Sequence, residues 1–158
     1  LYQAEPLRAV LYSLLFSLLT VVALIDWRTF EIPNGLNLAI FLLGAVQLAG
    51  DTAHWKTYLI GMFSVSLLFL LLWFVTKGNG LGMGDVKLMG AAGLLLGWQR
   101  ILLAMILGSV SGAIIHSVRM KRGAPRKLAF GPYLAAGIWV AALWGDRLIA
   151  AYLGLFGL

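Results

Sequence analysis

Six long apolar runs without a charged residue constrain this chain more than any other feature of its sequence. They cover residues 9–25, 34–50, 57–76, 88–99, 101–118 and 128–145. Several reach the roughly 20 residues needed to cross about 30 Å of hydrocarbon. Backbone groups cannot stay unpaired in lipid, and the runs lack the two-residue alternation of a barrel strand, so we expect helices. We predict an all-α membrane protein, a bundle of about six transmembrane helices forming a single domain over residues 1–158.

Two apolar segments leave alternatives open. The run 88–99 is too short to span alone unless it recruits Val86, Lys87 and residues after Arg100. The apolar tail 148–158 either extends the sixth helix or lies along the membrane interface. Composition supports the general class, because 61% hydrophobic and 11% charged residues leave too little polar surface for a soluble domain.

The distribution of basic residues predicts the orientation. Short basic loops stay in the cytoplasm, and alternate loops then place eight of the twelve Lys and Arg on that side: Arg28, Lys77, Lys87, Arg119, Lys121, Arg122, Arg126 and Lys127. Both termini fall outside. The net charge of +6 is explained by this rule and is not a nucleic-acid signature. The chain begins at Leu1 rather than at a methionine, and no signal-peptide pattern precedes Leu7.

Two of the six acidic residues have unusual settings. Asp26 directly follows an apolar run, so it lies in the last turn of a helix, where the macrodipole and nearby hydrocarbon disfavour its ionised form. Asp85 precedes the fourth run and is predicted as its N-cap, where ionisation is favoured. Two spans separate the two acids, so both lie at the cytoplasmic edge. Asp51 and Asp146 are instead assigned to solvated helix ends, beside His54 and Arg147 respectively.

The glycine-rich stretch GNGLGMGD, residues 78–85, ends on Asp85. It superficially resembles a phosphate-binding loop, but a membrane helix rather than a strand precedes it. A flexible loop is a second interpretation. Alternate glycines also allow another chain to approach closely, so we favour clearance for a substrate backbone at Gly80 to Gly84.

A pair of carboxylates can hydrolyse a peptide bond by sharing a proton, one acting as base on water and the other as acid. We assign the proton to Asp26 and the activation of water to Asp85. His54 and His116 are too few for a zinc site, and each is assigned to the interface. The absence of cysteine removes thiolate ligands, so no metal or other cofactor is expected.

Three motifs, DWRTFEIPN (residues 26–34), GMGDVKL (82–88) and FGPYLAAG (130–137), occur in this order at predicted helix boundaries. Together they resemble the type IV prepilin peptidases, which are GxGD-type intramembrane aspartyl proteases. The resemblance covers nearly the whole chain. It implies that Asp26 and Asp85 are the catalytic pair and that Gly82 and Gly84 are the motif glycines. Lys87, Pro33 and Asn34 match motif positions with supporting roles that the resemblance does not specify, as do residues 130–132.

The resemblance implies an aspartic endopeptidase of the bacterial cytoplasmic (inner) membrane. Its expected substrates are type IV prepilins or pseudopilins, whose basic leader is cut at the cytoplasmic face in pilus assembly and protein secretion. Membrane lipid is the other expected partner; nucleic acid and small-molecule cofactors are not expected. Many bacterial members also N-methylate the product through a segment with paired CxxC motifs. This chain has no cysteine, so we expect no methyltransferase activity: it is a peptidase-only member or the C-terminal part of a bifunctional one.

Two other function classes stay open at this point. A small membrane transporter relaying protons through the two acids is one. It is disfavoured because the halves of the chain show no paired repeat and both acids lie at one edge. A purely structural subunit of a secretion system is the other, and it leaves Asp26 unexplained.

Overall fold

The computed structural model describes residues 4–157, which form six α-helices and one short 3-10 helix, with no strand among them. The prediction of an all-α protein of about six helices is confirmed. In chain order the elements are α1 (Ala4–Thr29), α2 (Asn34–Gly50), η1 (Thr52–His54), α3 (Trp55–Thr76), α4 (Met83–Leu96), α5 (Trp98–Lys121) and α6 (Gly131–Leu155).

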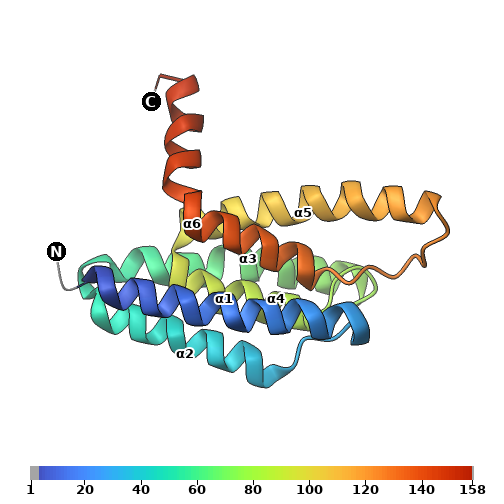
Figure 1. Ribbon diagram of the computed structural model, residues 1–158, viewed down its shortest axis with the longest axis horizontal. Coiled ribbons are helices and arrows are strands. Elements are labelled where there is room, and N and C mark those ends of the chain that lie inside the picture. The colour runs from blue at the N-terminus through green and yellow to red at the C-terminus, as the bar shows by residue number, and fades with distance from the viewer. Residues whose placement is uncertain (1–3, 158) are drawn as a thin grey trace.

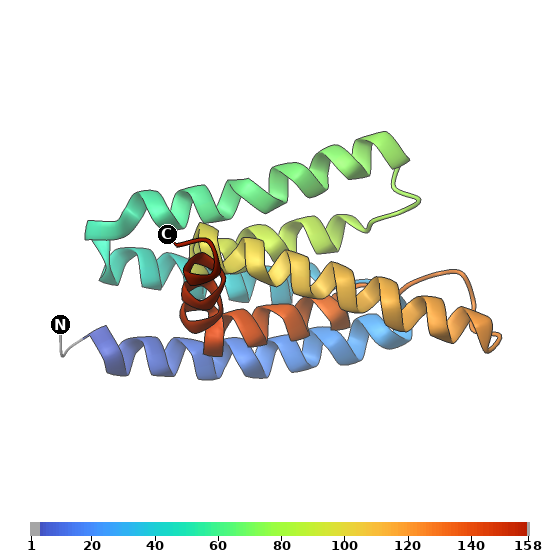
Figure 2. The same ribbon diagram turned by 90° about the horizontal axis from the view of Figure 1, so that it is seen from above.

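The helices run back and forth along a common axis, so their connections gather at two ends of the bundle (Figure 1). The segments 30–33, 77–82 and 122–130 lie at one end, which we call the Asp26 end. The segment containing η1 and the junction at Gly97 lie at the other, which we call the Gly97 end. Figure 2 shows the same grouping from above. The alternation of helices therefore brings three connections that are distant in sequence to one end.

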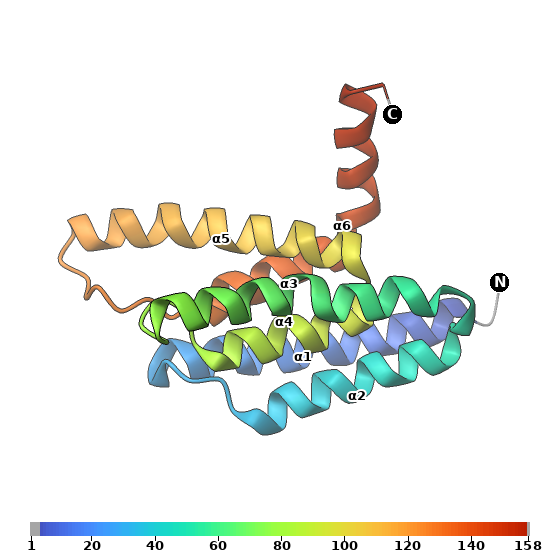
Figure 3. The same cartoon turned by 180° about the vertical axis from the view of Figure 1, so that it is seen from behind.

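Helix α4 is the central element of the bundle. It packs against α2, α3, α5 and α6, and Figure 3 shows it between α2 and α3. Eleven of its 14 residues are buried, so its neighbours shield it from lipid. It turns directly into α5 at Gly97, whose φ of +84° lies in a region that favours glycine. The predicted single segment 88–99 is corrected: α4 begins at Met83 and ends at Leu96.

Within residues 4–157, four helices are long and apolar enough to cross a membrane, over Pro6–Thr29, Thr52–Thr76, Trp98–Lys121 and Gly131–Leu155. Helix α2 is apolar but has 17 residues, and α4 has 14. A 14-residue helix is only about 21 Å long, shorter than the hydrocarbon core. The chain is a multi-pass membrane protein, and six helices do not mean six full spans.

Most of the tail after residue 147 belongs to α6, which confirms the alternative in which the tail extends the sixth helix. Helix α6 continues to Leu155, and its last part turns away from the bundle axis (Figure 1). The side chains of Tyr152, Leu155 and Phe156 are exposed there. If the bundle axis crosses the membrane, this part of α6 lies along the membrane plane.

Helices α3 and α4 meet at a pair of glycines. A Cβ added to Gly93 would lie 2.2 Å from the carbonyl oxygen of Gly61. Ala normally stabilises a helix by about 1 kcal/mol relative to Gly, but overpacking here costs roughly 1–3 kcal/mol. We therefore expect Gly93→Ala to lower the melting temperature of the detergent-solubilised protein by several degrees. Gly35→Ala, where nothing lies within 4 Å of the added Cβ, is the matched control and leaves it unchanged or slightly higher. An equally stable Gly93→Ala variant would contradict this packing.

Candidate active site

Asp26 lies in the last turn of α1, as predicted. Its main-chain oxygen accepts the N–H of Phe30 at 2.8 Å, and α1 ends where Phe30 adopts a φ of +58°. The Asp26 side chain is 4% exposed, and its Oδ2 accepts the N–H of Gly131 at 2.8 Å. Gly131 is the first residue of α6. The carboxyl group therefore sits at two helix ends, the C-terminus of its own helix and the N-terminus of α6.

Asp85 was predicted as the N-cap of α4, but it is the third residue of the helix, three positions after the actual N-cap. The N-cap is Gly82, whose extended backbone ends the glycine-rich segment. Asp85 Oδ2 accepts the N–H of Gly82 at 3.2 Å, a bond that satisfies one free N–H of the helix start. The side chain is 7% exposed, and Oδ1 is buried without a hydrogen-bond partner among the described residues. One oxygen of Asp85 is therefore held by the start of α4, and the other is buried and unpaired among the described residues.

The two carboxyl groups line one cavity of about 750 Å³ at the Asp26 end. Its walls come from the ends of α1, α3 and α5, the start of α4, and the segments 78–82 and 126–130. No hydrogen bond joins the two carboxyl groups in this described region. The structure thus brings two acids that are 59 positions apart in the sequence to the same cavity.

The predicted supporting residues lie around the start of α2. Pro33 is the N-cap of α2, and Asn34 is the first residue of that helix. Asn34 Oδ1 accepts a hydrogen bond from Lys87 Nζ at 2.8 Å. This bond joins α2 to α4 at the cavity, which both side chains line. Nearby, the buried Asn37 donates to the carbonyl oxygen of Gly84 at 3.3 Å, a contact that no sequence pattern signalled.

The motif glycines also have a packing role that was not predicted. A Cβ on Gly84 would lie 3.0 Å from Cβ of Ile32, so α4 packs directly on the segment after α1. A Cβ on Gly82 would lie 3.2 Å from Asp85 Oδ2. The Cβ direction at Gly84 is therefore filled by the chain itself. The absence of a side chain at Gly84 lets Asp85 approach the segment that follows Asp26. Gly80, Gly82 and Gly84 also line the cavity of the two acids, and clearance there for a substrate backbone stays a prediction.

Segment 122–130 contributes basic side chains to the cavity of the two acids, which the sequence did not predict. Arg126 and Lys127, predicted only to fix the topology, line the cavity of the two acids. Lys127 Nζ lies 4.8 Å from the ring centroid of Phe30. Arg119, in the last turn of α5, lies 4.4 Å from that of Trp27. These cation–π contacts tie the basic region to the end of α1. The only available sequence signal was the Phe-Gly-Pro of residues 130–132, which marks a helix start.

His116 is buried, so its assignment to the interface was wrong. The ring is 9% exposed, and Nε2 lies 3.1 Å from the carbonyl oxygen of Arg126. A carbonyl oxygen can only accept, so Nε2 carries the hydrogen of this bond. The contact holds segment 122–130 against α5 at Arg126. Arg126 lies four residues before Phe130, which is followed by Gly131, whose N–H contacts Asp26. Isolated in the sequence, His116 gave no sign of this contact.

The arrangement brings two carboxyl groups to one cavity, as hydrolysis by a pair of carboxylates requires. Two buried acids from different helices line one cavity, and one oxygen of each accepts a main-chain N–H. The other oxygen of Asp85 has no partner among residues 4–157. Paired carboxyl groups in such a setting can share a proton and act on a water molecule. The catalytic role of the pair stays a prediction from this geometry.

Comparison with known proteins places the chain in a family. The family model described as the type IV leader peptidase family matches residues 13–117. A protein of Pseudomonas aeruginosa named prepilin leader peptidase/N-methyltransferase is 38% identical over 150 residues, covering 88% of this chain and 51% of that protein. Proteins with the same name from Stutzerimonas stutzeri and Pseudomonas putida are 36% and 32% identical, covering 85% and 99% of this chain and 50% and 57% of their own lengths.

The chain thus spans about half the length of these relatives. No solved structure matches it. The family model covers both α1 with Asp26 and α4 with Asp85, about two thirds of the chain, and relatives above 30% identity extend the match over most of the rest. On this evidence the chain belongs to the type IV leader peptidase family.

Proposed function

We propose that this protein is an intramembrane aspartyl endopeptidase that removes the basic leader of type IV prepilins or pseudopilins. The observation that carries the proposal is the meeting of Asp26 and Asp85 on one cavity, each held by a main-chain N–H. The substrate class comes from the relatives, which are named prepilin leader peptidases. We expect no methyltransferase activity from these 158 residues, and this stays a prediction.

We place the cavity at the cytoplasmic face of the bacterial inner membrane. The Asp26 end carries most of the basic side chains, including the cluster from Arg119 to Lys127. Short segments rich in Lys and Arg stay in the cytoplasm during insertion. Cleavage then occurs where a basic leader, itself retained in the cytoplasm by the same rule, joins an apolar helix.

The contacts of the two acids support a division of roles opposite to the one favoured by the sequence. We place the catalytic proton on Asp85 Oδ1, because this buried oxygen has no partner and can donate to the scissile carbonyl. Asp26 is then the base that takes a proton from water. Its Oδ2 accepts from the N-terminus of α6, where N–H groups and the helix dipole suit a carboxylate. As the water attacks, Asp85 gives up its proton and Asp26 gains one, so the pair ends with the same number of protons.

No observation favours the transporter. Asp26 lies in the last turn of α1 and Asp85 in the first turn of α4, so neither is halfway along its helix, and the family match is to leader peptidases. The direct test incubates the purified chain in detergent with a model prepilin and identifies the products by mass spectrometry. We expect one cut between the leader and the apolar helix. A folded protein that leaves the prepilin intact would contradict the proposal.

The pH dependence of cleavage is a second expectation. Two coupled carboxyl groups titrate as a pair, and catalysis needs the singly protonated state. We expect a bell-shaped profile of kcat/KM within roughly pH 4 to 8, because activity is lost when the pair binds a second proton or loses the shared one. Melting temperatures measured across the same range separate titration from unfolding. A flat profile over this range would argue against the dyad mechanism.

A further inference from the structure

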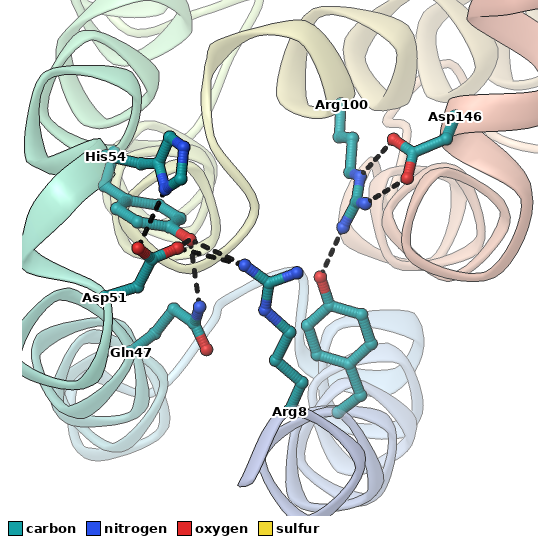
Figure 4. A network of polar contacts seen from close by, with 8 residues as sticks. Arg8, Gln47, Asp51, His54, Arg100 and Asp146 are labelled. Atoms are coloured by element: carbon teal, nitrogen blue, oxygen red, sulfur yellow. Dashed lines mark hydrogen bonds and ion pairs between the residues drawn. The ribbon is translucent and has the colours of Figure 1, made fainter. Parts of the chain in front are cut away.

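A second polar cavity lies at the Gly97 end, far along the bundle from the two acids. Its volume is about 370 Å³, and side chains from α1, α2, α3, α5 and α6 line it. Figure 4 shows the polar groups that surround it, with Arg8 lying between the group around Asp51 and the pair formed by Arg100 and Asp146. Such a concentration of polar groups in an apolar bundle is costly unless the groups are paired or have a ligand.

Most of these groups are paired. Asp51 accepts from Arg8 at 3.0 Å and Tyr58 at 2.8 Å, and its Oδ1 lies 2.8 Å from His54 Nδ1. The hydrogen bonds from His54 and then Tyr58 hold the pKa of Asp51 below its usual value. Asp146 binds Arg100 through both carboxylate oxygens, so its predicted partner Arg147 was wrong. Asp146 pairs with Arg100 rather than with its neighbour in sequence because α5, which carries Arg100, packs against α6.

Two polar groups on the cavity wall keep unused hydrogen-bonding capacity. The Gln47 side chain is 97% buried, since its exposure is 3%; Nε2 donates to Tyr58 at 2.9 Å, while Oε1 is buried with no partner among the described residues. Arg8 donates only through Nη2 to described side chains, and 44% of its side chain is exposed. The cavity therefore has an unpaired acceptor at its floor and guanidinium donors at its rim.

The position of the cavity points to lipid as the source of its ligand. Trp55 and Trp98, which begin α3 and α5 at this end, are 48% and 39% exposed. Exposed tryptophan at the ends of membrane spans marks the level of the lipid headgroups. The rim residue Arg8 lies within two residues of the start of the first candidate span. A phospholipid of the adjacent leaflet therefore has its headgroup at the depth of the cavity mouth.

We propose that this cavity is a binding site for a phospholipid headgroup that carries its own hydrogen-bond donor. The phosphate binds the free N–H groups of Arg8, a pairing that guanidinium geometry favours. The ammonium of phosphatidylethanolamine or a hydroxyl of phosphatidylglycerol reaches the floor and donates to Gln47 Oε1. Phosphatidylcholine has the same phosphate but a quaternary ammonium without N–H, so it leaves Gln47 unpaired. The proposal concerns lipid binding and does not rest on peptidase activity.

Native mass spectrometry of the detergent-purified protein tests this proposal. Phosphatidylethanolamine, phosphatidylglycerol and phosphatidylcholine with identical acyl chains are titrated separately. We expect the first two to bind about tenfold more tightly than the third, the value of roughly one hydrogen bond to a buried group. Equal binding of all three would overturn the proposal and leave a cavity in which water satisfies Gln47.

Two variants test the two contacts separately. Gln47→Leu removes the floor acceptor, so we expect it to abolish the preference over phosphatidylcholine. Arg8→Ala removes the phosphate contact and weakens all three lipids alike. Lys56→Ala is the matched control, because Lys56 is an exposed cation at the same end that does not line the cavity. If Lys56→Ala weakens binding as much as Arg8→Ala does, general surface charge explains the binding and the site is wrong.

Soluble O-phosphoethanolamine distinguishes lipid from a free phosphate compound. We expect it to compete only at concentrations far above those of the lipid, because it lacks acyl chains. Competition at lipid-like concentrations would overturn the assignment to lipid. Asp26→Asn is expected to bind lipid like the wild type, so a failure of the proposed peptidase function and a failure of this site are distinguishable.

Discussion

Replacing either Asp26 or Asp85 by asparagine is expected to lower the rate of leader cleavage by at least about 10³-fold, the scale of positioned acid–base catalysis. Asparagine keeps the size of the side chain and an oxygen that accepts the N–H of Gly131 at position 26 or of Gly82 at position 85. The loss is therefore chemical rather than structural. The measurement is single-turnover cleavage of a model prepilin, with melting temperatures to show that both variants are folded.

Glu31→Gln is the matched control for these two substitutions. Glu31 is an acid that lines the same cavity but is exposed and lies outside the proposed pair. We expect its variant to keep cleavage within a few-fold of the wild type. If Asp26→Asn or Asp85→Asn keeps a tenth of the wild-type rate, that acid has no catalytic role. If Glu31→Gln loses as much as they do, the cavity needs negative charge in general rather than a dyad.

Gly131→Ala should lower kcat by roughly 10²-fold, the cost of displacing a catalytic group by about 1 Å. A Cβ at position 131 would lie 2.7 Å from Oδ2 and 3.0 Å from Cγ of Asp26. The carboxyl group must move or lose its hydrogen bond to the start of α6. We expect KM to change little, because the substitution acts on the base rather than on substrate contacts.

The control for this prediction comes from the same helix. Gly154→Ala in α6 adds a Cβ with nothing within 4 Å and is expected to leave cleavage unchanged. A double variant decides whether Gly131 acts through Asp26. If it does, Gly131→Ala adds nothing to the defect of Asp26→Asn. Full activity in Gly131→Ala would show that the contact between α6 and Asp26 is dispensable.

Much of the site was predictable because the number of helices between two residues can be read from the sequence. An even number of antiparallel helices returns the chain to the same end of the bundle. Asp26 follows one apolar run and Asp85 precedes the fourth, so two antiparallel helices between them return the chain to the same end. The last-turn position of Asp26 followed directly from where the apolar run stops. The start of α4 was less predictable, because three glycines near Asp85 allow several backbone paths and the helix begins before the apolar run does.

The remaining features of the site depend on contacts that have no local signal. The sequence favoured Asp26 as the proton carrier because the end of α1 disfavours its anion, whereas the start of α4 favours that of Asp85. The N–H of Gly131, 105 positions away, adds a second helix end that favours the opposite role. His116 and Asp146 show the same limit. His116 is isolated in the sequence and Asp146 has the charged neighbour Arg147, yet the partner of each lies on a different segment.

The amino-acid sequence by itself determined that the protein lies in a membrane, that it is helical, and that Asp26 and Asp85 share one end. These properties follow from hydropathy and chain length, which add up residue by residue along each segment. Only the tertiary structure decided that α4 is a short helix enclosed by its neighbours, that Gly131 contacts Asp26, and that Gln47 faces a second cavity with an unpaired oxygen. The physical reason is that these contacts depend on the rotation and crossing of whole helices, which packing over many residues fixes together.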